Sequence, residues 1–143
     1  VIYTLADVID DKRWWGIKND TFTTHEMLRN LGCDEALMIG DRDRATHIFR
    51  SKLLKTGYTL TSATRELRKC FGVQQEILPM CEEDVATKVI TPEGELHFQE
   101  FWVKQKGESE VIDVVFRGIE MARMTKDVRK TIDGSKAVVI GPS

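Results

Sequence analysis

The spacing of apolar residues changes about halfway along the chain, from a helical period to a strand period. In the first half, apolar positions recur at intervals of three and four, which is the period of an amphipathic helix. A residue with a capping side chain stands near the start of three such segments, and a glycine follows each of them. The pattern predicts helices over residues 1–10, 23–31, 43–55 and 61–71, with Thr23 and Glu26, Asp43 and Thr61 as caps and Gly32, Gly57 and Gly72 as ends.

The second half is typical of short strands, because β-branched and aromatic residues are concentrated in short runs. Pro92-Glu93-Gly94 separates two of these runs and predicts a hairpin turn. A short helix over residues 125–132 and a turn at Asp133-Gly134 follow. The runs predict strands over residues 73–78, 87–91, 95–103 and 111–116.

The last apolar run, residues 136–140, is continuously apolar, as in a strand buried within a parallel sheet. A tight loop, Gly141-Pro142-Ser143, follows it at the position where open α/β sheets bind ligands. Helices followed by strands favour an α/β fold that carries an inserted helical and hairpin region. Because the chain also opens without methionine, we expect an excerpt of a longer protein; a complete reading frame without flanking sequence would contradict this.

Composition predicts one globular unit. A chain of 143 residues with 41% hydrophobic and 31% charged residues is long enough for one core and too short for two ordinary domains. We expect residues 1–80 to be mainly helical, and residues 81–143 to hold the hairpin, the strands and the return to a core sheet. The net charge of -2 gives no general attraction to nucleic acid or to an anionic membrane. No apolar run approaches the roughly 20 residues of a membrane span, and no signal peptide is visible.

The cysteines indicate a reducing compartment. Cys33, Cys70 and Cys81 are odd in number and lie far apart, without the spacing of a metal site. This arrangement predicts neither a disulfide framework nor a zinc site, so we expect free thiols in a soluble, cytoplasmic protein.

Residues 39–47 carry the densest charge of the chain, with four charges of alternating sign after a glycine. Gly40 allows close approach of the backbone to a ligand, and with Asp43 as the cap the free helix amides would point toward an anion. Arg42 and Arg44 add forked donors suited to phosphate or carboxylate. A second interpretation is a capped surface helix with exposed ion pairs. The helix is expected to bind through Asp43, His47 and Arg50 and to pack through Ala45, Ile48, Phe49 and Leu53.

Two aromatic and polar groups leave alternatives open. Trp14 and Trp15 either stack on a flat ligand or anchor their connection to the core. His97 and Gln99 alternate in a predicted strand, so they either line a polar pocket or face solvent. Their neighbours Phe98 and Trp102 are assigned to the core.

Five separated stretches follow one another as Asp11-Lys12-Arg13-Trp14-Trp15-Gly16, Asn19-Asp20-Thr21-Phe22, Gly40-Asp41-Arg42-Asp43-Arg44-Ala45-Thr46-His47, His97-Phe98-Gln99-Glu100-Phe101-Trp102 and Ile140-Gly141-Pro142-Ser143. In order and spacing they resemble the 2-phospho-L-lactate transferases of deazaflavin coenzyme biosynthesis, over essentially the whole chain. The opening residues 1–5 also resemble the helix that follows an acidic metal-binding segment in that family.

The resemblance implies a Mg2+-dependent transferase of coenzyme F-420 biosynthesis. A guanosine diphosphate-activated phospholactate, or its enolpyruvyl (phosphoenolpyruvyl) analogue, would transfer its phosphoryl-linked acid to a ribityl hydroxyl of the deazaflavin Fo, and GMP would leave. The implied fold is a Rossmann-like α/β core, incomplete here, with the helical and β-hairpin insertion. The family's glycine-rich phosphate loop and the aspartates implicated in metal binding are absent from this chain. We therefore assign no metal ligand and expect the isolated fragment to be inactive.

The resemblance and the side-chain chemistry together suggest roles for several residues. Arg42 and Arg44 would contact phosphate, and His47 would hydrogen-bond the acceptor or its phosphate. Asp41 or Asp43 would hold a ribityl hydroxyl or a metal-bound water, while no catalytic base is assigned. The predicted substrate-binding residues are Trp15, Met38, Ile39, Gly40, Asp41, Arg42, Asp43, Arg44, Thr46, His47, His97 and Gln99, and the predicted nucleotide-binding residues are Gly141, Pro142 and Ser143.

Two other classes of function remain open. One is a noncatalytic, sugar-nucleotide-binding regulator with a related core, and the other is a folded domain whose charged loop is purely structural. The Trp-Trp-Gly and Gly-Asp-Arg-Asp motifs favour the transferase. The sequence determines neither the donor acid nor the oligomeric state, for which a homodimer is one option.

Overall fold

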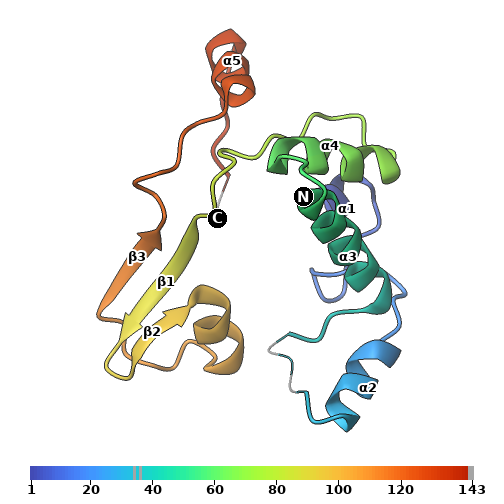
Figure 1. Ribbon diagram of the computed structural model, residues 1–143, viewed down its shortest axis with the longest axis vertical. Helices are drawn as coiled ribbons and strands as arrows, with labels where there is room; N and C mark the ends of the chain where they lie inside the picture. Colours follow the sequence, from blue (N-terminus) through green and yellow to red (C-terminus); the bar gives the residue numbers. More distant parts are fainter. Residues whose placement is uncertain (34, 36, 142–143) are drawn as a thin grey trace.

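The chain folds as a group of helices followed by a small sheet, and the computed structural model places the two groups beside each other (Figure 1). The structure describes residues 1–33, 35 and 37–141. The helical group contains α1 (Ile2–Leu5), α2 (Thr23–Asn30), α3 (Asp41–Lys55) and α4 (Leu60–Cys70). The sheet group contains β1 (Ala86–Thr91), β2 (Gly94–His97), the π-helix η1 (Glu100–Lys104) and β3 (Asp113–Arg117), and α5 (Lys126–Gly134) follows.

Three of the four helices predicted in the first half are confirmed as α2, α3 and α4. Gly32, Gly57 and Gly72 all have positive φ after these helices, which is the conformation that ends a helix at a glycine. The first predicted helix is wrong in length, because α1 ends at Leu5. Asp7 enters the left-handed region with a φ of 55°, and the chain then turns back to pair Ile9 with Ile17.

The core of the helical group lies between α3 and α4. Leu53 of α3 and Ala63 and Leu67 of α4 are buried there. Of the predicted packing residues of α3, Leu53 is confirmed as buried, whereas Ala45, Ile48 and Phe49 are exposed, contrary to the prediction. The helix instead turns the side with Asp43 and Leu53 inward, because Asp43 accepts a hydrogen bond from the Tyr3 hydroxyl of α1.

Two aspartates exchange helix caps between α2 and α3. The Asp20 carboxylate, just before α2, accepts the backbone N–H groups of Arg42 and Asp43 at 2.9 and 3.1 Å. In return, the Asp41 carboxylate at the start of α3 accepts the backbone N–H groups of Thr23 and Thr24 at 3.1 and 3.0 Å. Each carboxylate therefore satisfies amides that the other helix leaves unpaired.

This exchange corrects two predicted caps. Asp43 is inside α3, whose N-cap residue is Gly40. Thr23 is the first residue of α2, and its N-cap residue, Phe22, makes no side-chain cap bond. The predicted cap of α4 is also displaced, because Thr59 rather than Thr61 accepts the Ser62 N–H. The carboxylates that cap α2 and α3 come from distant residues, whereas Thr59 directly precedes the helix that it caps.

The sheet is antiparallel with strand order β2-β1-β3. The predicted hairpin is confirmed, with Thr91 opposite Gly94 and Val89 opposite Leu96. On its other side, Val89 lies opposite Val114 of β3. The strand predicted over residues 111–116 is thus confirmed, with its bounds shifted to Asp113–Arg117. Val89 is almost completely buried, so it is the centre of this small sheet.

One predicted strand is too long, and two others are not formed. The strand predicted over 95–103 ends at His97, and the chain then forms η1. Residues 73–78 and 136–140 form no strand, and Val139 and Ile140 are 92% and 93% exposed. A strand that is apolar on both faces requires paired strands and cover on both sides. The described residues place neither beside 136–140.

The π-helix also changes the aromatic core. Phe98 and Trp102 are exposed, contrary to their predicted burial, and their rings stack at a centroid distance of 6.3 Å. Phe101, between them in sequence, is the buried aromatic residue of this segment. The π-helical turn therefore places Phe101 inward and leaves the neighbouring ring pair at the surface.

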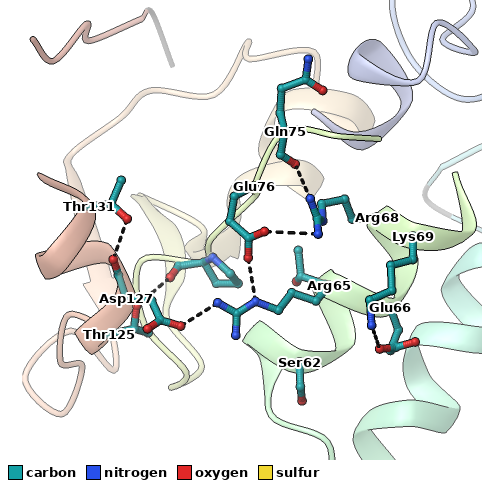
Figure 2. A network of polar contacts seen from close by, with 12 residues as sticks. Ser62, Arg65, Glu66, Arg68, Lys69, Gln75, Glu76, Thr125, Asp127 and Thr131 are labelled. Carbon is teal, nitrogen blue, oxygen red and sulfur yellow. Dashed lines mark hydrogen bonds and ion pairs between the residues drawn. The ribbon is translucent and has the colours of Figure 1, made fainter. Parts of the chain in front are cut away.

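Ion pairs attach α5 to α4, and Figure 2 shows them. Arg65 of α4 donates to Glu76 and to Asp127 of α5, each at 2.7 Å. Arg68 lies 3.3 Å from the second carboxylate oxygen of Glu76. The hydrogen bond from Arg65 holds the pKa of Glu76 below its ordinary value. A backbone bond from Thr125 to Met80 adds a second connection at the same end of α5.

Helices together with a β-sheet confirm the mixed α/β class of the prediction. The short helix predicted over 125–132 is confirmed as α5, with Thr125 as its N-cap. The Rossmann-like parallel core stays a prediction, since the sheet described here is antiparallel. In the part of the chain that the structure describes, no helix is long and apolar enough to cross a membrane.

The first prediction tests the α3–α4 core. Leu53 is 9% exposed and its neighbour Leu54 is 37% exposed, so the two leucines form a matched pair. We expect Leu53→Ala to lower the free energy of unfolding by about 2–5 kcal/mol, the range for a truncated core leucine. Leu54→Ala is expected to cost clearly less in the same urea denaturation measurement. Equal losses would contradict the inward orientation of α3.

The second prediction concerns the pH dependence of the exchanged caps. Hydrogen bonds, the largest effect coming from Thr21, hold the pKa of Asp41 far below its ordinary value. A depressed pKa stabilises the fold above the unfolded-state value, about 4 for aspartate, and this stabilisation is lost as the pH falls through the folded-state pKa.

We therefore expect Asp41→Asn to reduce the loss of stability that the wild type shows as the pH falls below about 4. Thermal unfolding across that range measures the difference. Asp11→Asn is the control for a lost charge, because the exposed Asp11 side chain has no hydrogen-bond partner among the described residues. An unchanged acid profile for Asp41→Asn would contradict the capping role.

Candidate functional site

One side of α3 lines a groove of about 530 Å³ that is rich in basic groups. Its basic side chains recur at helical spacing, so they form one continuous stripe along the helix. None of the lining residues carries a carboxylate, which makes the groove suited to an anionic ligand. The groove is lined by Ile39, Arg44, His47, Ile48, Ser51, Lys52, Lys55 and Thr56.

Arg44, at one end of this groove, is held by a partly buried ion pair. Its two terminal nitrogens donate to the two carboxylate oxygens of Glu35 at 2.8 and 2.7 Å. The same carboxylate contacts Nδ1 of His25 from α2 at 2.9 Å. Hydrogen bonds from Arg44, and then from His25, hold the pKa of Glu35 below its ordinary value. The two terminal donors of Arg44 are therefore engaged within the protein, while its buried Nε has no partner in the described structure.

His47 lies where this groove meets a second hollow of about 290 Å³, whose lining includes Tyr3, Thr46 and Arg50. Its Nε2 atom is 3.3 Å from Oδ1 of Asp43. The Tyr3 hydroxyl donates to the same oxygen at 2.6 Å. Burial, followed by the hydrogen bond to Asp43, raises the pKa of Tyr3. Tyr3 therefore remains a hydrogen-bond donor, and Asp43 is directed toward protein groups.

Arg42 differs from the charged residues around it. Its side chain is exposed and makes no hydrogen bond or ion pair with the residues that the structure describes. Its backbone N–H is occupied by Asp20, as described above. The prediction that free amides at the start of α3 point toward an anion is therefore wrong, because Asp20 already accepts them. The cation of this turn that can reach a ligand is the Arg42 guanidinium.

Asp20, Asp41 and Asp43 lie near one another at the start of α3, so we tested whether they fit a Mg2+ ion. Their oxygens already accept hydrogen bonds: Asp20 from two helix amides, Asp41 from α2 and Asp43 from Tyr3. Across residues 1–33, 35 and 37–141, no group of three or more His, Cys, Asp or Glu side chains is arranged to hold a metal ion. These residues do not fit a Mg2+ site.

The other predicted site residues lie apart from the groove. Trp15 is exposed, and the Arg13 guanidinium stands 5.6 Å from its ring centroid. Trp14 is 77% exposed, so the described fold does not anchor it in the core. His97 ends β2, and its Nδ1 accepts the backbone N–H of Gln99 at 3.3 Å.

The remaining predicted residues fall into three groups. Met38 is exposed and leads into the groove through Ile39. The Thr46 hydroxyl donates to the Arg42 carbonyl at 3.1 Å, and buried Gly40 is the N-cap residue of α3. Gly141 is exposed at the end of an unpaired segment, and Pro142 and Ser143 lie outside the described residues.

Several residues around the groove were missing from the sequence prediction. Lys52 and Lys55 could have been found, because they follow Arg44 at helical spacing on one face of α3. Tyr3, Asp20 and Glu35 could not, because their partners lie 9 to 40 positions away along the chain. Only tertiary contact brings them to the site.

Comparison with known proteins agrees with the motif pattern. The family model described as 2-phospho-L-lactate transferase CofD matches residues 1–143. The 2-phospho-L-lactate transferase of Methanosarcina mazei is 46% identical over 143 residues, and that of Methanosarcina acetivorans is 47% identical over the same length. The protein of the same name from Methanocaldococcus jannaschii is 41% identical over 147 residues. In each case the alignment covers 100% of this chain and 47% of the relative.

The chain thus spans about half the length of the curated relatives it matches. The match nevertheless covers every residue described above, from the helix that holds Tyr3 to the segment after α5. The chain belongs to the 2-phospho-L-lactate transferase CofD family.

Proposed function

We propose that the protein containing this chain is a 2-phospho-L-lactate transferase, and that this chain binds the acceptor side of the reaction. Two observations carry the proposal: the groove along α3, which has basic side chains and no carboxylate, and the exposed Arg42 in the first turn of the same helix. This groove lies in a chain whose relatives bear the transferase name.

In the proposed reaction, a ribityl hydroxyl oxygen of the deazaflavin Fo attacks the phosphorus atom that carries lactate or enolpyruvate. The bond from that phosphorus to the GMP oxygen breaks, and GMP leaves. The hydroxyl proton passes to a base that we do not assign among these residues. Such a transfer demands mainly alignment and neutralisation of phosphate charge, which arginine and lysine side chains supply.

The geometry supports different roles for the two arginines. Arg42 has no partner among the described residues, so its five donors are available to a phosphate or to the oxygens of the acceptor. Arg44 uses two donors on Glu35, so it contributes to the groove mainly by positioning α3 against α2. His47, exposed between the two hollows, is placed to hydrogen-bond a ligand in either.

The other predicted contacts and partners also belong to this proposal. Met38 and Ile39 would offer backbone groups to the deazaflavin ring, and Trp15, His97 and Gln99 remain predicted substrate contacts. Gly141, Pro142 and Ser143 remain the predicted nucleotide contacts. A bound Mg2+ would neutralise charge on the transferring group, with ligands outside the residues described here. A cytoplasmic location and a homodimer also remain predictions.

The third prediction tests the role of Arg42 in binding Fo. In the full-length protein, we expect Arg42→Ala to lose about 1.5–3 kcal/mol of binding free energy, because a charge-assisted hydrogen bond is removed. This corresponds to a Kd that is roughly 10 to 100 times higher in calorimetric titration with Fo. Arg129→Ala is the matched control, since Arg129 is an exposed arginine of α5 without a partner among the described residues. Equal Fo affinity for Arg42→Ala and wild type would remove the binding role.

The fourth prediction separates binding from catalysis. The isolated 143-residue chain is expected to release no detectable GMP from an activated phospholactate and Fo, because it spans only about half the length of the transferases it matches. The full-length protein is expected to release GMP in the same chromatographic assay. Turnover by the isolated chain would contradict this prediction, because it would show that the catalytic groups lie within these 143 residues. Binding by the full-length protein without GMP release would favour a noncatalytic regulator.

A further inference from the structure

Asp20 is bonded to the start of α3, a helix that begins about 20 residues later in the sequence. Its carboxylate accepts the backbone N–H groups of Thr21, Arg42 and Asp43 at 2.8, 2.9 and 3.1 Å. We propose that Asp20 is a positioning residue for substrate binding, which acts by fixing the direction in which Arg42 leaves α3. This inference rests on the proposed function, in which Arg42 contacts the acceptor.

Gly40 shows how closely Asp20 approaches the α3 turn. A Cβ atom at position 40 would collide with the Asp20 carboxylate, and it would stand only 2.9 Å from the Asp20 Cβ. Gly40 has a φ of -70°, which any residue adopts, so backbone conformation does not require glycine there. Glycine is required by the space that Asp20 occupies. The pair therefore acts as one unit that places a carboxylate directly over the first turn of α3.

The first turn of α3 is held from both sides. Asp20 accepts the N–H of Arg42, while the Arg42 carbonyl accepts the hydroxyl of Thr46. From the segment that precedes α2, the Thr21 carbonyl accepts the N–H of Asp41 at 2.8 Å. The Arg42 backbone cannot rotate without breaking these bonds. The Arg42 side chain makes no such bond, so the direction of its Cα–Cβ bond is set by the hydrogen bonds that hold the backbone.

Asp20 itself is not placed to contact a ligand. Both of its oxygens accept protein N–H groups, and the helix amides that could otherwise receive an anion are filled by them. A loss of substrate affinity on changing Asp20 must therefore be transmitted through α3 and Arg42. That transmission distinguishes positioning from direct binding.

The test compares two caps in the full-length protein. Asp20→Ala removes the cap of α3, and Thr59→Ala removes the equivalent cap of α4, where Thr59 accepts the Ser62 N–H. Both variants are expected to lower Tm by a few degrees, about the effect of one lost cap. Only Asp20→Ala is expected to raise the Kd for Fo by about tenfold or more, since small misplacements of a binding group are costly. Asp20→Asn, which keeps one oxygen acceptor, is expected to restore part of the affinity.

A double-mutant cycle tests the link between Asp20 and Gly40. Gly40→Ala is expected to weaken Fo binding about as much as Asp20→Ala, because the added methyl group displaces the carboxylate. Asp20→Gly removes the three atoms that lie nearest to a Cβ at position 40. The double variant Asp20→Gly/Gly40→Ala is therefore expected to bind Fo no more weakly than Asp20→Gly alone, a non-additive result. If the losses of Fo affinity in the two single variants added up in the double variant, the proposed coupling between Asp20 and Gly40 would be overturned.

Hydrogen exchange supplies a readout without substrate. The amides of Arg42 and Asp43 are expected to lose protection in Asp20→Ala and to keep it in Thr59→Ala. If wild type binds Fo and Asp20→Ala binds it equally well, the positioning role is overturned while the proposed function stands. If wild type does not bind Fo, the proposed function fails and the positioning role fails with it.

Discussion

The exchange of aspartate caps between α2 and α3 is the interaction on which the candidate site depends. Asp20, which precedes α2, accepts free amides at the start of α3. Asp41, the first residue of α3, accepts a free amide at the start of α2. Helix N-termini carry partial positive charge, so a carboxylate at each one is favourable on electrostatic grounds as well. The exchange brings the two helix starts together, and it requires Gly40 at the point of closest approach. The direction of α3, and with it the basic groove, follows from this junction.

The same junction explains how so dense a charge cluster folds. Asp41 accepts hydrogen bonds from α2, Asp43 accepts one from Tyr3, and Arg44 forms an ion pair with Glu35, so each of these charged groups has a polar partner within the protein. Buried charges are tolerated when they are paired and hydrogen-bonded in this way. Arg42 is the charge of the cluster without a partner among the described residues. Internal pairing thus leaves the Arg42 guanidinium exposed on the first turn of α3, while the basic groups that line the groove begin at Arg44.

The sheet contributes little to this site. Its hairpin and η1 place His97, Gln99 and the stacked Phe98 and Trp102 rings away from the groove lining. Arg65 links α4 to α5 through a balanced ion network, which has the character of a structural connection. The proposed binding role therefore rests on the helical group and its basic groove.

The sequence by itself determined the helices, the hairpin and the family. Helical spacing and terminal glycines such as Gly57 are local properties, as is the turn at Pro92-Glu93-Gly94, and local patterns survive in the fold. Tertiary structure alone decided which side of α3 is buried and which carboxylate caps it. Asp43 was expected to face a ligand, yet it faces Tyr3, 40 positions earlier. Periodicity specifies that a helix has two sides, but only contacts between distant segments determine which side packs.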